Sequence, residues 1–152
     1  MSLDITRCLS AEYESLRGQC ADLCAGSSSQ QRAAAEKLLS AVTAHTLAEE
    51  ETMLARAADI EALRPQALKA LEEHEVTENE FLRLWQSVDE EQFATRASVV
   101  CDLLRYQWQE AEEKLLPFLR LQVTAEESEL MAVRYREIKE RHKLSTLLRM
   151  PD

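Results

Sequence analysis

The apolar residues of this chain recur every three or four positions, a spacing that places them on one face of a helix. The first such stretch carries apolar or aromatic side chains at Ile5, Leu9, Tyr13, Leu16, Cys20 and Leu23. Three more stretches repeat the pattern, over residues 38–53, 71–85 and 101–119. The spacing therefore predicts four amphipathic helices, each with one side buried against the others.

Turn and capping residues set the expected limits of the first two helices. The first is expected from about Leu3 to Ala25 and to stop at Gly26, a residue common just after helices. The serines at 27–29 supply an N-cap for a second helix, which is expected to reach about Ala58. The pattern breaks over residues 59–64, so a connection is expected there.

Two prolines mark the limits of the next two helices. Pro65 suits the first turn of a third helix, which is expected to end near Ser87. The acidic run at 89–91 opens a fourth helix. Pro117 is expected to kink or end it, because the proline ring clashes with the preceding turn.

Thr124 and Glu127 form a capping-box pattern, which predicts a fifth helix that reaches about His142. Residues 143–152 are expected to be loosely held. The apolar side of this helix is formed by Leu130, Met131, Val133, Tyr135 and Ile138. It is expected to cover the bundle, with contact to a protein partner or a second copy of the chain as the alternative.

Composition narrows the fold class. The chain has only two Gly and three Pro, and its commonest residues are strong helix formers. At 152 residues it has the size of one domain with a sizeable core. We therefore predict an all-α protein of a single domain, 1–152. It is an antiparallel up-down four-helix bundle over about residues 3–120, with an additional C-terminal helix at about 124–142.

Charge, hydropathy and cysteine spacing argue against nucleic-acid or membrane partners and indicate where the protein is located. The formal net charge of −10 disfavours nucleic acid and anionic membranes, which both require basic patches. No apolar run approaches the roughly 20 residues needed to span a bilayer. Residues 1–8 do not resemble a signal peptide, and the four cysteines form no zinc-finger or CxxC spacing. A cytoplasmic location with reduced thiols is expected.

Each apolar stripe is interrupted near its middle. The interrupting side chains, in chain order, are Tyr13, His45 with Glu49, His74 with Glu78, and Trp108 with Glu112. A buried ionised carboxylate is costly unless it is paired or bound to a metal ion. Three helices that each direct a carboxylate inward are therefore not typical of a purely apolar core.

The interrupting residues are also expected to lie at one height. Residues of an antiparallel helix pair are level when they are equally far from the connecting turn, and the two His–Glu pairs centre on residue 61 or 62. The imidazoles of His45 and His74 are thus expected within about 10 Å of each other. Bundle metal sites are assembled in this way. His–Glu pairs four residues apart are also common on helix surfaces, so both interpretations stay open.

Three motifs resemble those of hemerythrin-like (HHE cation-binding) domains. The segment His45-Thr-Leu-Ala-Glu49-Glu50 matches H-x-x-x-E-E, Glu73-His74 is similar to the third-helix E-H, and the segment from Glu112 to Pro117 resembles E-E-x-x-L-F-P. The resemblance covers about residues 3–120. It implies a four-helix bundle around a carboxylate-bridged, non-haem di-iron site. It also implies a role in the sensing, binding or storage of iron, oxygen or nitric oxide.

Carried over residue by residue, the metal ligands are His45, Glu49, His74 and Glu112. Tyr13, Glu78 and Trp108 stand where related proteins have His. The indole nitrogen of Trp108 is only a donor and cannot ligate, whereas Tyr13 and Glu78 are candidates for additional ligands to a ferric ion. The resemblance thus implies a modified iron site, mono- or dinuclear, with Glu50 and Glu113 as residues that orient the ligating histidines.

Two functional interpretations remain. A retained metal site would bind a metal ion together with O2 or NO. A bundle without metal would act as an interaction or regulatory module, with Trp108 in the space of the metal and the carboxylates bonded to Tyr13 and the histidines. A di-iron oxidase is disfavoured, because its Glu-x-x-His motif is missing. With no phosphate loop, nucleophile elbow or Ser/His/Asp set, no enzymatic activity is expected.

Overall fold

The computed structural model describes residues 3–149, with side chains for residues 3–143, and this part of the chain is helical and contains no strand. The all-α prediction is confirmed. The elements are α1 (Ile5–Ala25), α2 (Ser28–Glu49), the π-helical turn η1 (Glu50–Leu54), α3 (Ala55–Ala58), α4 (Arg64–Trp85), α5 (Glu90–Lys114), α6 (Leu116–Gln122) and α7 (Ala125–Arg149).

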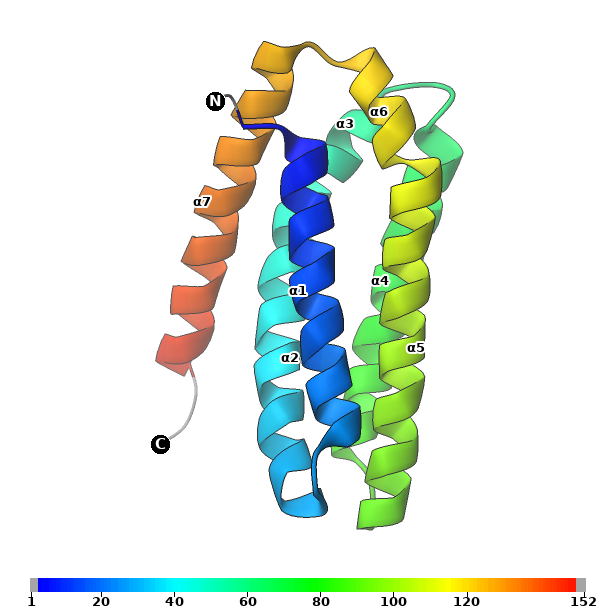
Figure 1. Cartoon of the computed structure of the whole chain (residues 1–152), viewed down its shortest axis with the longest axis vertical. Coiled ribbons are helices and arrows are strands. Elements are labelled where there is room, and N and C mark those ends of the chain that lie inside the picture. The colour runs from blue at the N-terminus through cyan, green and yellow to red at the C-terminus, as the bar shows by residue number, and fades with distance from the viewer. Residues whose placement is uncertain (1–2, 150–152) are drawn as a thin grey trace.

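Four long helices, α1, α2, α4 and α5, lie side by side, and consecutive ones run in opposite directions (Figure 1). The short helices α3 and α6 lie together at one end. Helix α7 runs along the outside of this group and packs against α2 and α1. None of the helices within residues 3–149 is both long and apolar enough to cross a membrane.

Helix limits follow the capping residues that the sequence indicates. The Asp89 side chain accepts a hydrogen bond from the Gln92 N–H (2.8 Å) at the start of α5. Thr124 Oγ1 accepts from the Glu127 N–H (3.1 Å) at the start of α7. Helix α1 ends at Ala25, directly before Gly26, as expected.

The second predicted helix is not regular throughout. It was expected as one helix to about Ala58, but α2 ends at Glu49 and continues through the π-helical turn η1 into α3. A π-helical turn holds one residue more than an α-helical turn, so Thr52, Met53 and Leu54 are all buried although they are consecutive. The predicted break near residues 59–64 is confirmed, and α4 begins there at Arg64.

Pro117 separates two helices, as predicted. Helix α5 ends at Lys114, and Pro117 lies in the first turn of α6. The last helix is longer than expected. Residues 143–149 continue the helix, and residues 150–152 lie outside the described residues.

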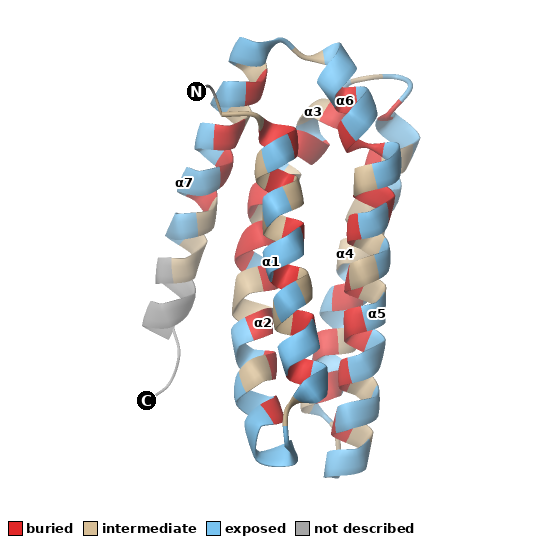
Figure 2. Cartoon of the chain, in the orientation of Figure 1, coloured by how far each residue is buried: buried red, intermediate tan, exposed pale blue. Residues whose placement is uncertain are grey.

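Buried residues recur along the long helices, alternating with exposed ones (Figure 2). Six apolar residues of the four stretches, Leu9, Leu16, Val42, Leu71, Leu104 and Leu115, are predicted from their spacing to face a common axis, and all except Leu71 are buried. Leu71 is only half-buried, because it borders an open groove between α2 and α4. The helical phase predicted for α1, α2 and α5 is therefore correct, whereas α4 buries Ala67, Thr77, Phe81 and Leu84 and turns Leu71 and Glu78 toward the groove.

Helix α7 covers the bundle, and the predicted apolar face is correct in part. Ala132, Tyr135 and Ile138 are buried, whereas Leu130 is 66 % exposed and Val133 points outward. Ser128 Oγ, on the same buried side, accepts a hydrogen bond from the Ile5 N–H (2.9 Å). The start of α1 is thus joined to the start of α7.

Candidate functional site

A buried carboxylate, that of Glu49 at the end of α2, is the centre of the predicted site. Glu49 is 4 % exposed. Its Oε2 accepts hydrogen bonds from Tyr13 Oη of α1 (2.6 Å) and from His45 Nε2 one turn earlier (3.0 Å). Its Oε1 lies 3.6 Å from His74 Nε2 of α4. Donors from three helices therefore converge on one carboxylate.

The electrostatics of this cluster are those of a satisfied ion pair. Burial by itself would raise the pKa of Glu49, but the contacts with His45 and His74 outweigh it and hold the pKa well below its ordinary value. Burial would lower the pKa of His74, yet Glu49 and Glu50 raise it to about 9. His74 is thus protonated at neutral pH. Its Nδ1 donates to Glu50 Oε1 (3.0 Å), so Glu50 orients His74, as expected.

One member of the cluster was missed by the sequence analysis. Tyr135 of α7 is fully buried, and its hydroxyl lies 2.6 Å from His45 Nδ1. Nε2 of the same ring faces the Glu49 carboxylate, so the imidazole lies between the phenol of α7 and the carboxylate of α2. Burial raises the pKa of both Tyr13 and Tyr135 well above the ordinary value, so both phenols remain donors.

Trp108 of α5 closes the cluster on its remaining side. The indole is 4 % exposed and stacks on the Tyr13 ring, with centroids 6.2 Å apart and an interplanar angle of 18°. A cavity of about 20 Å³ remains between Tyr13, Glu49, His74 and Trp108, which is room for about one water molecule. Trp108 thus occupies space at the level where the sequence predicted a shared polar site.

Two predicted members lie outside the hydrogen-bonded cluster. The Glu112 carboxylate, on α5, is one-third exposed and pairs with Arg17 Nη2 of α1 at 2.5 Å. Glu78 is exposed and lines the groove between α2 and α4. Glu113, expected to orient a histidine, accepts instead from Gln109 Nε2 (2.9 Å). The structure therefore brings together Tyr13, His45, Glu49, His74 and Trp108, and the expected proximity of the two imidazoles is confirmed.

The chemistry of these donors does not fit a metal ion in the present arrangement. A metal ligand must offer a free lone pair, and His ligands must therefore lose a ring proton. Here His74 Nδ1 is engaged by Glu50 Oε1, and the Tyr13 hydroxyl donates a hydrogen bond to Glu49. Among the side chains of residues 3–143, no group of three or more His, Cys, Asp and Glu is arranged to hold a metal ion. The carboxylate and its donors satisfy one another instead.

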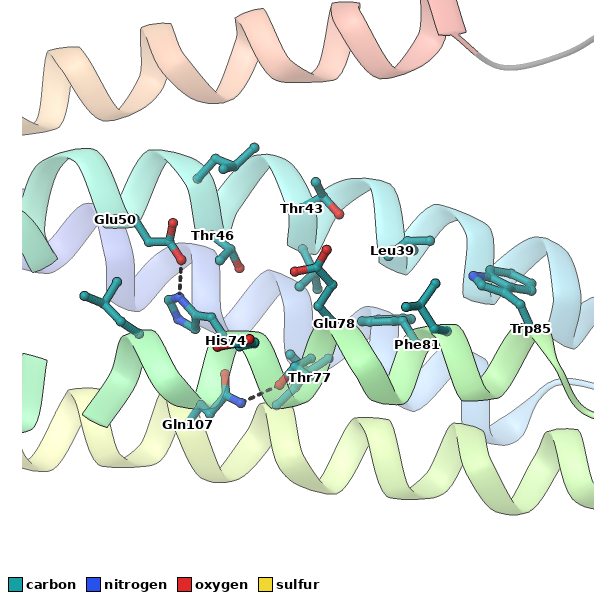
Figure 3. A pocket seen from close by; sticks show the side chains of 16 residues that line it. Leu39, Thr43, Thr46, Glu50, His74, Thr77, Glu78, Phe81, Trp85 and Gln107 are labelled. Atoms are coloured by element: carbon teal, nitrogen blue, oxygen red, sulfur yellow. Dashed lines mark hydrogen bonds and ion pairs between the residues drawn. The ribbon is translucent and has the colours of Figure 1, made fainter. Parts of the chain in front are cut away.

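A groove of about 450 Å³ opens beside the cluster, between α2 and α4 (Figure 3). The Glu50–His74 pair lies toward one end, and Leu39, Phe81 and Trp85 lie toward the other. Glu78 stands between the two ends. The sequence analysis missed this groove. Its only signal was the polar Thr43 and Thr46, one and four residues after Val42 on α2.

Comparisons with known proteins find no match to this chain among protein-family models, curated proteins or solved structures. The resemblance to hemerythrin-like domains therefore rests on the three sequence motifs alone.

Proposed function

We propose that this chain is a metal-free, hemerythrin-like bundle that acts as a binding module. In this proposal the hydrogen-bonded Glu49 cluster takes the structural place of a metal centre, and the neighbouring groove holds the ligand. The observation that carries the proposal is that both oxygens of the Glu49 carboxylate have partners. Oε2 contacts Tyr13 Oη and His45 Nε2, and Oε1 faces His74 Nε2.

The contacts of the cluster support a structural role for it. A buried ion pair is a poor source of net stability, but loss of one partner is costly, about 3–5 kcal/mol, because it leaves an unpaired charge. Glu49 joins α1, α2 and α4, and Tyr135 adds α7 through His45. Such a cluster fixes the relative positions of four helices without a metal ion.

The groove supports the binding role. Small-molecule sites are mostly apolar clefts of about 300–1,000 Å³ with a few polar groups. The groove between α2 and α4 has about 450 Å³, and its lining is mostly apolar with a charged pair at one end. A site of this kind suits an interaction or regulatory module.

Metal binding is the second candidate, favoured by two observations. The Nε2 atoms of His45 and His74 both face the Glu49 carboxylate, at 3.0 and 3.6 Å. A π-helical turn follows Glu49 directly, and such turns are frequent at functional sites. In this candidate His45, Glu49 and His74 would hold iron, with Tyr13 as a further ligand.

Metal titration separates the two candidates. Protein purified without chelator or affinity nickel is unfolded thermally with and without Fe²⁺ or Zn²⁺, as wild type and as the His45→Ala/His74→Ala double variant. We expect added metal to change the thermal unfolding temperature of the two proteins equally. We also expect elemental analysis to find no bound metal. Specific binding would stabilise the wild type alone, by about 2.7 kcal/mol at a hundredfold excess over Kd. That result would overturn the metal-free proposal.

A further inference from the structure

The groove between α2 and α4 has two unlike ends. Figure 3 shows Glu50 and His74 at one end and Trp85 at the other, with Leu39 and Phe81 beside it. Thr43 and Thr46 on α2 are short, and they face α4 where Glu78 projects. Because short side chains on one helix oppose the other helix here, the space of about 450 Å³ stays open.

The charges along the groove are not balanced. The His74 cation is neutralised by Glu49 and Glu50, at 3.6 and 3.0 Å. Glu75 and Glu78 also line the groove, and neither carboxylate has a hydrogen bond or ion pair with any residue that the structure describes. The whole chain, these carboxylates included, has a formal net charge of −10. An uncompensated carboxylate, Glu78, therefore stands next to an apolar wall.

We propose that this groove binds a small organic cation, an ammonium group on an apolar alkyl or aryl-alkyl body. The ammonium lies against Glu78, and the body extends along Leu39 and Phe81 to Trp85. The inference rests on the proposed function as a binding module, to which it adds the class of ligand.

The geometry sets the length of that ligand. Glu78 and Trp85 are seven residues apart on α4, which corresponds to about 10 Å at 1.5 Å per residue. An aromatic ring joined to an amine by four methylene groups spans a similar length. Thr43 lines the same groove, and its hydroxyl offers the ammonium a second acceptor. An anion of the same shape would meet Glu78 and Glu75 and be repelled.

The test compares 4-phenylbutylamine with 4-phenylbutyrate, which share the apolar body and differ in the sign of the charge. Calorimetric titration at low ionic strength limits screening. We expect saturable binding of the amine with a Kd below about 1 mM, and binding of the carboxylate at least about tenfold weaker. Equal affinity for the two compounds, or no saturable binding of the amine, would overturn the proposal.

Three variants locate the site. Glu78→Gln removes the carboxylate and is expected to weaken amine binding about threefold or more. Glu72→Gln, an exposed position on α4 outside the groove, is the matched control and should leave the affinity unchanged. Thr43 is exposed and lines the groove, so the larger ring in Thr43→Phe can be placed without disturbing the core. The ring should fill the groove and abolish binding. Equal affinities in the wild type and Glu78→Gln would show that the amine binds elsewhere.

These outcomes are distinct from those of the metal titration. If the wild type binds no amine and its stability is unaffected by metal, the proposed class of ligand is wrong, whereas the proposal of a metal-free bundle is kept. A wild type that is specifically stabilised by metal overturns the metal-free proposal, whether or not it binds the amine.

Discussion

The hydroxyl of Tyr13 donates to Glu49 Oε2 across 2.6 Å, and it joins two helices through residues that are 36 positions apart in the chain. Both side chains are buried. Buried polar groups require partners, because each group left without one loses its hydration without compensation. The stability of the bundle should therefore depend on this contact more than on any exposed hydrogen bond.

Tyr13→Phe removes the hydroxyl and keeps the ring that stacks on Trp108. Glu49 then loses one donor in a buried site, so we expect the free energy of unfolding to fall by about 1–3 kcal/mol. Urea denaturation measures the change. Tyr106→Phe is the control, since that exposed hydroxyl also bonds a glutamate, Glu110, and its loss should cost less than about 1 kcal/mol. Similar losses in the two variants would show that Glu49 does not depend on Tyr13.

Tyr135→Phe tests the contact between α7 and the bundle. His45 Nδ1 would lose its partner in a buried site, so we expect a loss of about 1–2 kcal/mol. The effects of Tyr13→Phe and Tyr135→Phe should not be additive, because both hydroxyls act on the single chain of contacts through His45 and Glu49. A double-mutant cycle measures the coupling. Strict additivity would contradict a connected cluster.

The pKa of His74 predicts how stability depends on pH. It is about 9 in the folded protein and 6.5 ordinarily. A raised pKa adds stability that is fully present below the unfolded value and is lost as the pH rises through the folded one. We expect this contribution, on the order of 2 kcal/mol, to disappear between about pH 6.5 and pH 9. Urea denaturation at several pH values should show the loss in wild type and not in His74→Gln.

Glu49 sets the acid limit of the same ion pair. Its pKa is depressed from the ordinary 4.5, so its contribution is present above pH 4.5 and is lost as the pH falls toward the folded value. The stability that the pair provides should therefore be greatest between about pH 4.5 and 6.5. Proton titration of His74 by NMR checks the assignment, because Glu49→Gln should lower its pKa. An unchanged pKa in that variant would contradict the pairing.

Leu104→Ala tests the packing of the core. Leu104 is 2 % exposed, and truncation of such a residue costs about 2–5 kcal/mol. Leu82→Ala provides the contrast, since Leu82 is 55 % exposed at the groove and its loss should cost less than about 0.5 kcal/mol. A small loss for Leu104→Ala would mean that the phase of α5 is wrong.

Helical periodicity and loop position were enough to predict much of the cluster. Equal distances from the turn near residue 61 place His45 and Glu49 level with His74, and the structure joins all three. Tyr135 was missed because the height of a residue can be predicted only for two helices joined by a simple turn. Helix α7 is separated from α5 by the short helix α6, so no such turn is available. Its buried face also differs from its most apolar face, since Leu130 and Val133 point outward.

Glu78 and Glu112 lie outside the hydrogen-bonded cluster for a different physical reason. An apolar stripe spans more than 100° of a helix, so residues at its edges point between helices rather than to the axis. Glu112 reaches Arg17 at such an edge, and Glu78 reaches the groove. The π-helical turn after Glu49 has no sequence pattern of the kind that marks caps and turns. Sequence alone could not show that α2 and α4 leave a groove open.

The contacts of α7 have a consequence for synthesis on the ribosome. The Ile5 N–H finds its acceptor in Ser128, and His45 Nδ1 finds its donor in Tyr135. Domains generally fold as units during synthesis, N-terminal parts first. In this chain the first four long helices emerge before the residues that complete their buried hydrogen bonds. His45 and the first turn of α1 therefore stay uncovered in the nascent bundle until α7 has left the exit tunnel.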